Sequence, residues 1–214
     1  DQRLSRGLGD VYKRQGYTES KMNPAGSYMD MQWFSWTQIY PFIRGANLAI
    51  LKLTENEAGF DSAFTNRLLG EAYFMRGYFY SQLMRQFGGV VLTLSPFALE
   101  DEAANPRASF EQTVNQIISD IDQSLILLAD APASKSRAHK VTALALKARV
   151  LTHAASDLYE PSKNSSISTI AGYSNKELVS YTSGSQAARW QAAKAASKAL
   201  LDATTGYKLD YSCL

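Results

Sequence analysis

Residues 67–89 read RLLGEAYFMRGYFYSQLMRQFGG, and the fold class follows from this stretch. Its apolar side chains recur at the three- and four-residue steps that place them on one face of an α-helix. They are Leu69, Tyr73, Met75, Phe79, Tyr80, Leu83 and Phe87. Gly88 and Gly89 end the pattern, because glycine adopts the left-handed conformation that helix ends often require. The stretch therefore predicts a long helix over residues 61–87.

Similar patterns lie on both sides of this helix. Apolar residues at helical spacing predict further helices over residues 38–54, 109–129, 140–158 and 186–204. Ser109 and Gln112 fit a capping box, in which each side chain binds a free backbone N–H group. Residues 90–94 predict a short extended connector, and the polar residues 159–184 predict a long loop.

The spacing of the predicted helices indicates how they pack. Short links join the members of a pair and long links join one pair to the next, which is the layout of stacked helical hairpins. Small residues such as Ala72, Gly77 and Ala148 allow neighbouring helices to approach closely. Glu71 and Arg76 are expected to form ion pairs of the scaffold. The sequence thus predicts an all-α fold of degenerate TPR-like hairpins, with long loops and little or no strand.

Composition excludes several classes of function. The 214 residues carry a formal net charge of +2, which does not indicate a nucleic-acid partner. A single cysteine, Cys213, excludes an internal disulfide framework and a cysteine-built zinc site. His139 and His153 would lie about 21 Å apart on one helix, so they cannot share a metal ion. No nucleotide-binding or hydrolase motif occurs, so no cofactor, metal or catalytic residue is expected.

The two ends of the chain differ from the rest of it. Residues 7–15 (GLGDVYKRQ) resemble a translated sequencing-adapter scar, and residues 212–214 resemble the start of a similar one. We therefore expect residues 1–15 to be a non-native leader and exclude them from fold reasoning, with a native N-terminal arm as the alternative. Residues 16–214 are expected to form the helical region.

Several blocks of the sequence resemble the SusD/RagB family. Residues 40–47 (YPFIRGAN) are similar to its first TPR-like helix, and residues 71–80 (EAYFMRGYFY) resemble its most recognisable stretch. Residues 83–92 continue that stretch, with Val91 where the family usually has proline. Similar blocks follow in the family's order at residues 107–120, 142–155 and 190–209.

This resemblance implies a lipoprotein of the outer membrane that captures glycan, or in some members peptide, at the extracellular face of the cell. Such proteins are not enzymes; they sit as a lid over a SusC-like TonB-dependent transporter and deliver glycan to it. The glycan and this transporter are the expected partners, and membrane contact is expected only through a lipid anchor absent from this chain. Family members are much longer, so residues 16–214 are expected to be the N-terminal TPR-like region, truncated on its C-terminal side.

Aromatic residues before the first predicted helix are candidates for glycan binding. Sugar rings stack their C–H faces on indole and phenol rings, and carboxylates or amides bind the hydroxyl groups. Tyr28, Asp30, Trp33 and Trp36 supply such groups, and their spacing places Trp33 and Trp36 on one side of a helix if the stretch is helical. The alternative is that both indoles pack in the core, since Trp buries a large area.

The loop 159–184 supplies a second group of candidates. Tyr159 and Tyr173 are the residues expected to line a glycan groove there, because long loops on a rigid scaffold often carry binding sites. The alternatives for this loop are a contact with the transporter or a solvated connector.

Two other functions compete with glycan capture. One is a TPR-like protein–protein interaction scaffold that binds no sugar. Exposure of the aromatic rings separates the two, because exposed rings favour sugar and buried rings leave only the scaffold. The other is a glycosidase, which needs two carboxylates about 5 to 9.5 Å apart in a cleft. The sequence nominates no such pair.

Overall fold

The computed structural model describes residues 35–96, 106–130, 136–164 and 172–206. In these ranges the chain forms helices and no strand, which confirms the predicted all-α fold. The long helices are α2 (Trp36–Glu55), α3 (Ser62–Phe87), α4 (Phe110–Leu127), α5 (Lys140–Ala155) and α8 (Gln186–Ala203). Between the last two lie the short turns η2 (Asp157–Tyr159), α6 (Pro161–Asn164) and η3 (Lys176–Leu178).

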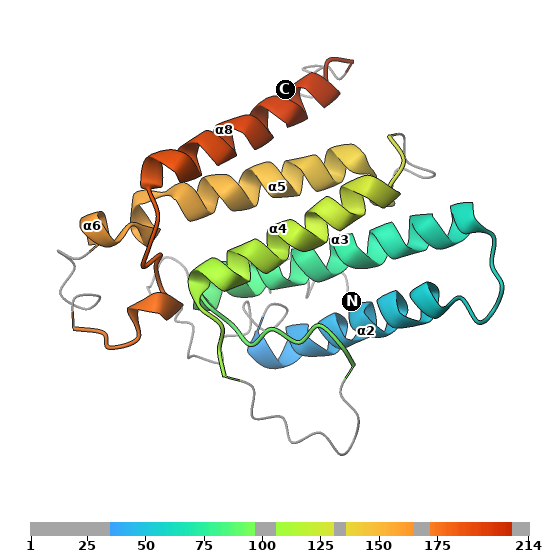
Figure 1. The fold of residues 1–214 in the computed structure, drawn as a ribbon, viewed down its shortest axis with the longest axis horizontal. Coiled ribbons are helices and arrows are strands. Elements are labelled where there is room, and N and C mark those ends of the chain that lie inside the picture. Colours follow the sequence, from blue (N-terminus) through green and yellow to red (C-terminus); the bar gives the residue numbers. More distant parts are fainter. Residues whose placement is uncertain (1–34, 97–105, 131–135, 165–171, 207–214) are drawn as a thin grey trace, which may run out of the picture.

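Each long helix packs against the next one along the chain. The contacting pairs are α2 with α3, α3 with α4, α4 with α5, and α5 with α8. Figure 1 shows these helices side by side, from α2 at the bottom of the view to α8 at the top. This arrangement is the predicted stack of helical hairpins.

Side-chain caps explain where α3 and α4 begin. The Ser109 hydroxyl accepts a hydrogen bond from the Gln112 N–H group at 3.1 Å, and the Gln112 amide oxygen accepts one from the Ser109 N–H group at 2.9 Å. This confirms the predicted capping box at the start of α4. At the start of α3, the Asp61 carboxylate accepts a hydrogen bond from the Phe64 N–H group at 2.9 Å.

Two predictions about the chain after α5 are wrong. The helix predicted over residues 140–158 ends at Ala155, because Ser156 adopts an extended backbone (φ −64°, ψ 160°) and the separate turn η2 follows. The loop predicted over residues 159–184 includes the turns α6 and η3. These turns span four and three residues, which is too short for a periodic apolar pattern to identify them.

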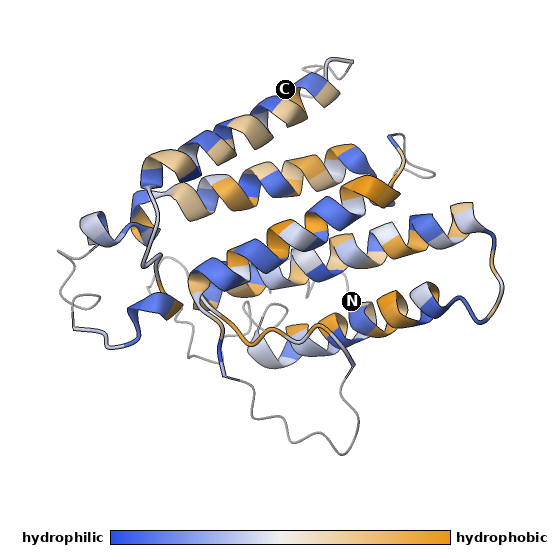
Figure 2. Cartoon of the chain, in the orientation of Figure 1, coloured by the Kyte–Doolittle hydropathy of each residue, from blue (hydrophilic) through white to orange (hydrophobic). Residues whose placement is uncertain are grey.

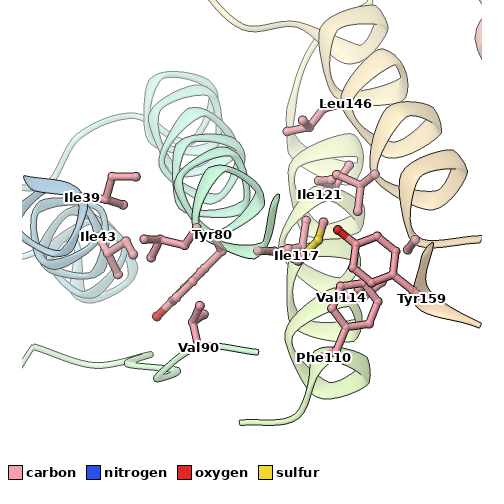
Figure 3. Close-up of a cluster of buried hydrophobic side chains, with 14 of the residues drawn as sticks. Ile39, Ile43, Tyr80, Val90, Phe110, Val114, Ile117, Ile121, Leu146 and Tyr159 are labelled. Atoms are coloured by element: carbon pink, nitrogen blue, oxygen red, sulfur yellow. The ribbon is translucent and has the colours of Figure 1, made fainter. Parts of the chain in front are cut away.

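The hydrophobic core runs through the middle of the stack. Figure 3 shows Ile39 and Ile43 of α2, Tyr80 of α3 and Ile117 of α4 within this buried cluster. Figure 2 shows the strongest apolar colour on α2 to α5, whereas α8 carries weaker apolar colour between polar residues. In agreement, the buried residues of α8 are the two small alanines Ala193 and Ala196.

Helices α3 and α4 approach closely at two glycines. A Cβ atom on Gly77 would lie 3.4 Å from the Cβ of Asp120, and one on Gly70 would lie 3.0 Å from the Cβ of Leu127. A Cβ at Gly77 would be in direct van der Waals contact with α4, and one at Gly70 would require its neighbours to shift by a few tenths of an ångström. The predicted role of Gly77 in close helix packing is therefore confirmed.

Arg76 and Asp120 form a buried ion pair between α3 and α4. Nε and Nη2 of Arg76 donate hydrogen bonds to the two carboxylate oxygens at 2.9 and 2.6 Å. Nη1 of Arg76 donates to the side-chain oxygen of Asn47 at 2.9 Å, and the Asn47 amide donates to the Thr93 carbonyl at 2.8 Å. These bonds join α2, α3, α4 and the connector after α3 into one buried polar network, so the predicted scaffold role of Arg76 is confirmed.

Candidate functional site

A pocket of about 410 Å³ lies at the C-terminal end of α3, between that helix and the chain around η2 and η3. We call it the α3-end pocket. Its described lining is largely apolar and aromatic, with one charged residue and one amide. Such a lining is typical of small-molecule sites, where a few polar groups orient a ligand on an apolar surface. The lining residues are Arg85, Gln86, Phe87, Gly88, Leu158, Tyr159, Tyr173 and Val179.

Two glycines bring the walls of this pocket together. Gly88 ends α3 with φ 73° and ψ −127°, a conformation that side chains with a Cβ rarely adopt. A Cβ on Gly88 would lie 2.1 Å from the carbonyl oxygen of Leu178, and the Gly89 N–H group donates to that same oxygen at 2.6 Å. The turn η3 can therefore lie this close to the end of α3 because residue 88 has no side chain.

Tyr159 lies in the core behind the pocket. Its side chain is 6% exposed and its ring stacks on Phe110, with centroids 4.1 Å apart and an interplanar angle of 14°. Its hydroxyl group lies 2.8 Å from Nε2 of His153. Burial raises the pKa of Tyr159, and the positive charge of Arg85 opposes that rise. Tyr159 lines the pocket as a rigid wall, and one ring face is occupied by Phe110.

Tyr173 and Leu158 form the exposed apolar part of the pocket. Tyr173 is 37% exposed and Leu158 is 52% exposed, and both belong to the segment after α5. The exposed phenol ring of Tyr173 offers the kind of surface on which a sugar ring can stack. Of the two candidates from the predicted loop, the structure therefore places Tyr173 at the surface and Tyr159 inside.

Trp36 packs behind Phe87, at the same end of the bundle. The two rings meet edge to face with centroids 5.4 Å apart, and the Tyr40 ring lies 5.1 Å from the indole. The guanidinium group of Arg107 lies 5.9 Å from the indole centroid and donates hydrogen bonds to the carbonyl oxygens of Phe87 and Gly89. Trp36 is partly buried against the core, and its ring contacts Tyr40 and Phe87 of the helical scaffold.

Phe87 connects the predicted candidates. It contacts Trp36 on one side and lines the pocket with Tyr159 and Tyr173 on the other. The other three candidates, Tyr28, Asp30 and Trp33, lie outside the described residues. Sequence reasoning placed Phe87 in the apolar stripe of α3 but did not identify it as a pocket residue. The signal that indicates such a role is its position immediately before Gly88 and Gly89, where the helix must end.

The described residues carry neither an ion site nor a helix suited to a bilayer. Within the described ranges, no group of three or more His, Cys, Asp and Glu side chains is placed to hold a metal ion. In the same part of the chain, no helix has both the length and the apolar character to span a membrane.

Together, the fold and the pocket define a class of protein: a stack of helical hairpins with an aromatic pocket at one end. Comparison with known proteins identifies the family. The SusD-like family model, described as "Starch-binding associating with outer membrane", matches residues 6–151. The chain belongs to the SusD-like family.

One known relative agrees with this assignment, and two solved structures share the fold. SusD-like protein P38 of Formosa agariphila is 32% identical over 141 residues, which are 65% of this chain and 26% of that protein. A solved SusD superfamily protein from Bacteroides thetaiotaomicron matches with a TM-score of 0.60 at 22% identity, over 82% of this chain and 33% of that one. A laminarin-binding SusD-like protein matches with a TM-score of 0.57 at 23% identity, over 67% of this chain and 30% of that one. The chain thus spans about a quarter to a third of the length of these relatives.

Proposed function

We propose that this chain captures glycan without catalysis, and that the α3-end pocket is part of its binding surface. The observation that carries the proposal is the exposed ring of Tyr173 beside Phe87, above a buried aromatic wall. Apolar rings offer stacking surfaces for the C–H faces of sugars, and the Arg85 and Gln86 side chains offer hydrogen bonds to hydroxyl groups. The family's description as starch-binding supports the same class of ligand.

The buried polar atoms of the pocket support ligand binding as well. The Gln86 side-chain oxygen is buried and accepts no hydrogen bond from any described residue. A buried acceptor without a partner costs about 1–3 kcal/mol, and that cost is removed if the amide turns toward the pocket and accepts a hydrogen bond from a ligand hydroxyl. Gln86 is therefore the residue that we expect to bind a sugar hydroxyl group.

Binding without catalysis is consistent with the chemistry of the pocket. Glycoside hydrolysis by the usual route needs an acid and a second carboxylate about 5 to 9.5 Å apart. No Asp or Glu is among the described residues that line the α3-end pocket. The pocket as described offers binding groups and no such pair.

We propose further that the captured glycan is delivered to a SusC-like TonB-dependent transporter, and that the protein acts at the extracellular face of the outer membrane. The family's description as associating with the outer membrane supports this location. The membrane contact would be made by a lipid anchor. Tyr28, Asp30 and Trp33 remain proposed glycan ligands in addition to Tyr173. Trp36 and Tyr159 are proposed to support the binding surface from behind.

Affinity electrophoresis of the chain in gels containing single polysaccharides tests the capture proposal. We expect Tyr173→Ala to weaken binding of the retarding polysaccharide at least about five-fold, because the exposed stacking surface is lost. Phe64→Ala is the matched control, since Phe64 is also 37% exposed but lies at the other end of α3, about 34 Å away. Equal loss of binding in both variants, or no loss in either, would mean that the glycan binds outside this pocket.

A protein–protein scaffold is the second candidate function, and a specific surface favours it. A groove of about 410 Å³ lies between α2 and α3 and is lined mainly by apolar residues, including Phe42, Leu53 and Met75. Phe42 is 51% exposed, although it stacks on Phe79. If no polysaccharide retards the chain in the gels, this groove becomes the better candidate for the functional surface.

A further inference from the structure

A second cavity adjoins the α3-end pocket and shares one residue with it. This cavity of about 280 Å³ lies between α3 and α5, and Arg85 lines both hollows. Arg149 and His153 of α5 face the same cavity, together with Gln82 of α3. Two guanidinium groups are therefore brought to one place by helices that are about 60 residues apart in sequence.

These two arginines differ from three other arginines that the structure describes. Arg76, Arg137 and Arg189 each pair with a carboxylate. By contrast, neither Arg85 nor Arg149 forms an ion pair or a hydrogen bond with any residue that the structure describes. Both side chains are exposed, and no Asp or Glu is among the described residues lining either cavity. The positive charge at this position is therefore not neutralised by the described part of the protein.

The titratable groups near Arg85, His153 and Tyr159, do not neutralise its charge. Burial and the positive charge of Arg85 both lower the pKa of His153, so this histidine is neutral at pH 7. Arg85 also opposes the burial-induced rise in the pKa of Tyr159. Because Arg85 lines both hollows, it lies where the aromatic pocket and the second cavity meet.

We propose that the glycan captured at the α3-end pocket is acidic, and that Arg85 and Arg149 bind its negatively charged groups. The inference rests on the proposed function, because it names the class of sugar that this pocket accepts. Guanidinium groups bind the oxygens of carboxylates and sulfates through paired, charge-assisted hydrogen bonds. An aromatic stacking surface beside two unneutralised guanidinium groups fits a sugar ring that carries a uronate carboxylate or a sulfate ester.

The test compares acidic and neutral forms of the same glycan. Isothermal titration calorimetry of the chain would use dextran sulfate against dextran, and polygalacturonate against its methyl ester. We expect at least about ten-fold tighter binding of one acidic form than of its neutral counterpart, and weaker binding as salt is raised. The first pair reports on sulfate and the second on carboxylate.

Two variants distinguish a specific contact with Arg85 and Arg149 from non-specific electrostatic attraction. The double variant Arg85→Gln with Arg149→Gln should lose at least about ten-fold in affinity for the acidic glycan. Arg44→Gln is the control, because Arg44 is an exposed arginine of α2 that lines neither cavity. Both changes lie on exposed side chains, so an unchanged melting temperature should accompany each of them.

The outcomes distinguish this inference from the function on which it rests. Equal affinity for acidic and neutral forms, or an undiminished affinity in the double variant, would overturn the inference and leave glycan capture standing. Absence of binding to every glycan would overturn both. Binding of poly-glutamate as tight as that of the acidic glycans, with the same loss in the double variant, would assign the arginines to an acidic protein partner and overturn the sugar assignment.

Discussion

At the scale of single residues, the aromatic side chains at the end of α3 fall into two groups. The Tyr159 ring stacks on Phe110 and the Trp36 ring meets Phe87 edge to face, whereas Tyr173 keeps an exposed ring. The first group therefore contributes rigidity and the second contributes contact area. Rigid support matters because a stacking surface that is already ordered costs little conformational entropy when ligand binds.

The buried pair of Arg76 and Asp120 gives a residue-scale prediction about stability. Burial raises the pKa of Asp120, and the bidentate contact with Arg76 opposes this and favours the ionised carboxylate. Asp120→Asn would leave the Arg76 guanidinium buried without a counter-charge, so we expect it to reduce the free energy of unfolding by about 3–5 kcal/mol. Urea denaturation followed by circular dichroism measures this change.

Lys198 and Asp202 of α8 provide the matched control for that experiment. Their ion pair is exposed, with side chains 71% and 62% accessible, so solvent screens it. Asp202→Asn should change the free energy of unfolding several-fold less than Asp120→Asn does. Similar changes in the two variants would show that burial does not set the strength of the Arg76 pair.

At the scale of elements, the junction after α3 determines whether the pocket exists. Gly88 adopts a positive φ, and Gly89 donates to the Leu178 carbonyl, so α3 and η3 meet through backbone atoms. Arg107 adds hydrogen bonds from its guanidinium to the last carbonyls of the junction. The start of α4 also lies here, because a Cβ on Gly89 would come within 2.1 Å of the Ala108 carbonyl oxygen.

Gly88→Ala tests this junction. The backbone conformation is strained for alanine by about 1–3 kcal/mol, and the added methyl group would also lie 2.1 Å from the Leu178 oxygen. We therefore expect a lower melting temperature and loss of the Tyr173 contribution to glycan binding, because η3 moves away from α3. Calorimetric melting and affinity electrophoresis measure the two effects.

Gly45→Ala is the control for the junction experiment. Gly45 lies inside α2, and a Cβ there would meet no atom within 4 Å. This substitution should leave binding unchanged and raise stability by up to about 1 kcal/mol, since alanine is the better helix former. A Gly88→Ala protein that melts and binds like wild type would mean that the junction tolerates a side chain.

At the scale of the whole molecule, the sequence predicts the helices well because helix formation depends on near neighbours. The predicted helix over residues 61–87 and the capping box at Ser109 both agree with the structure. Pairings between distant residues are not visible in local spacing. Arg76 meets Asp120 and Glu71 meets Arg137, which are 44 and 66 positions away. The ion pairs were predicted, but their partners were not.

The candidate site was predicted only in part, for the same reason. Tyr159 and Tyr173 do lie at one pocket with Phe87, but no sequence pattern indicates that the Tyr159 ring stacks on Phe110. Exposure of an aromatic ring depends on which helices pack around it. The meeting of Arg85 and Arg149 was not predicted for the same reason, because the two residues line one cavity only once α3 and α5 have packed around it.

Amide chemical-shift mapping shows whether glycan binds at the α3-end pocket. The 23.6 kDa chain would be labelled with ¹⁵N and titrated with oligosaccharides from the polysaccharide that it binds best. We expect the largest shifts on residues 85–88, 158–159 and 172–179. Largest shifts along α8 or in the groove between α2 and α3, with none around Phe87 and Tyr173, would contradict it.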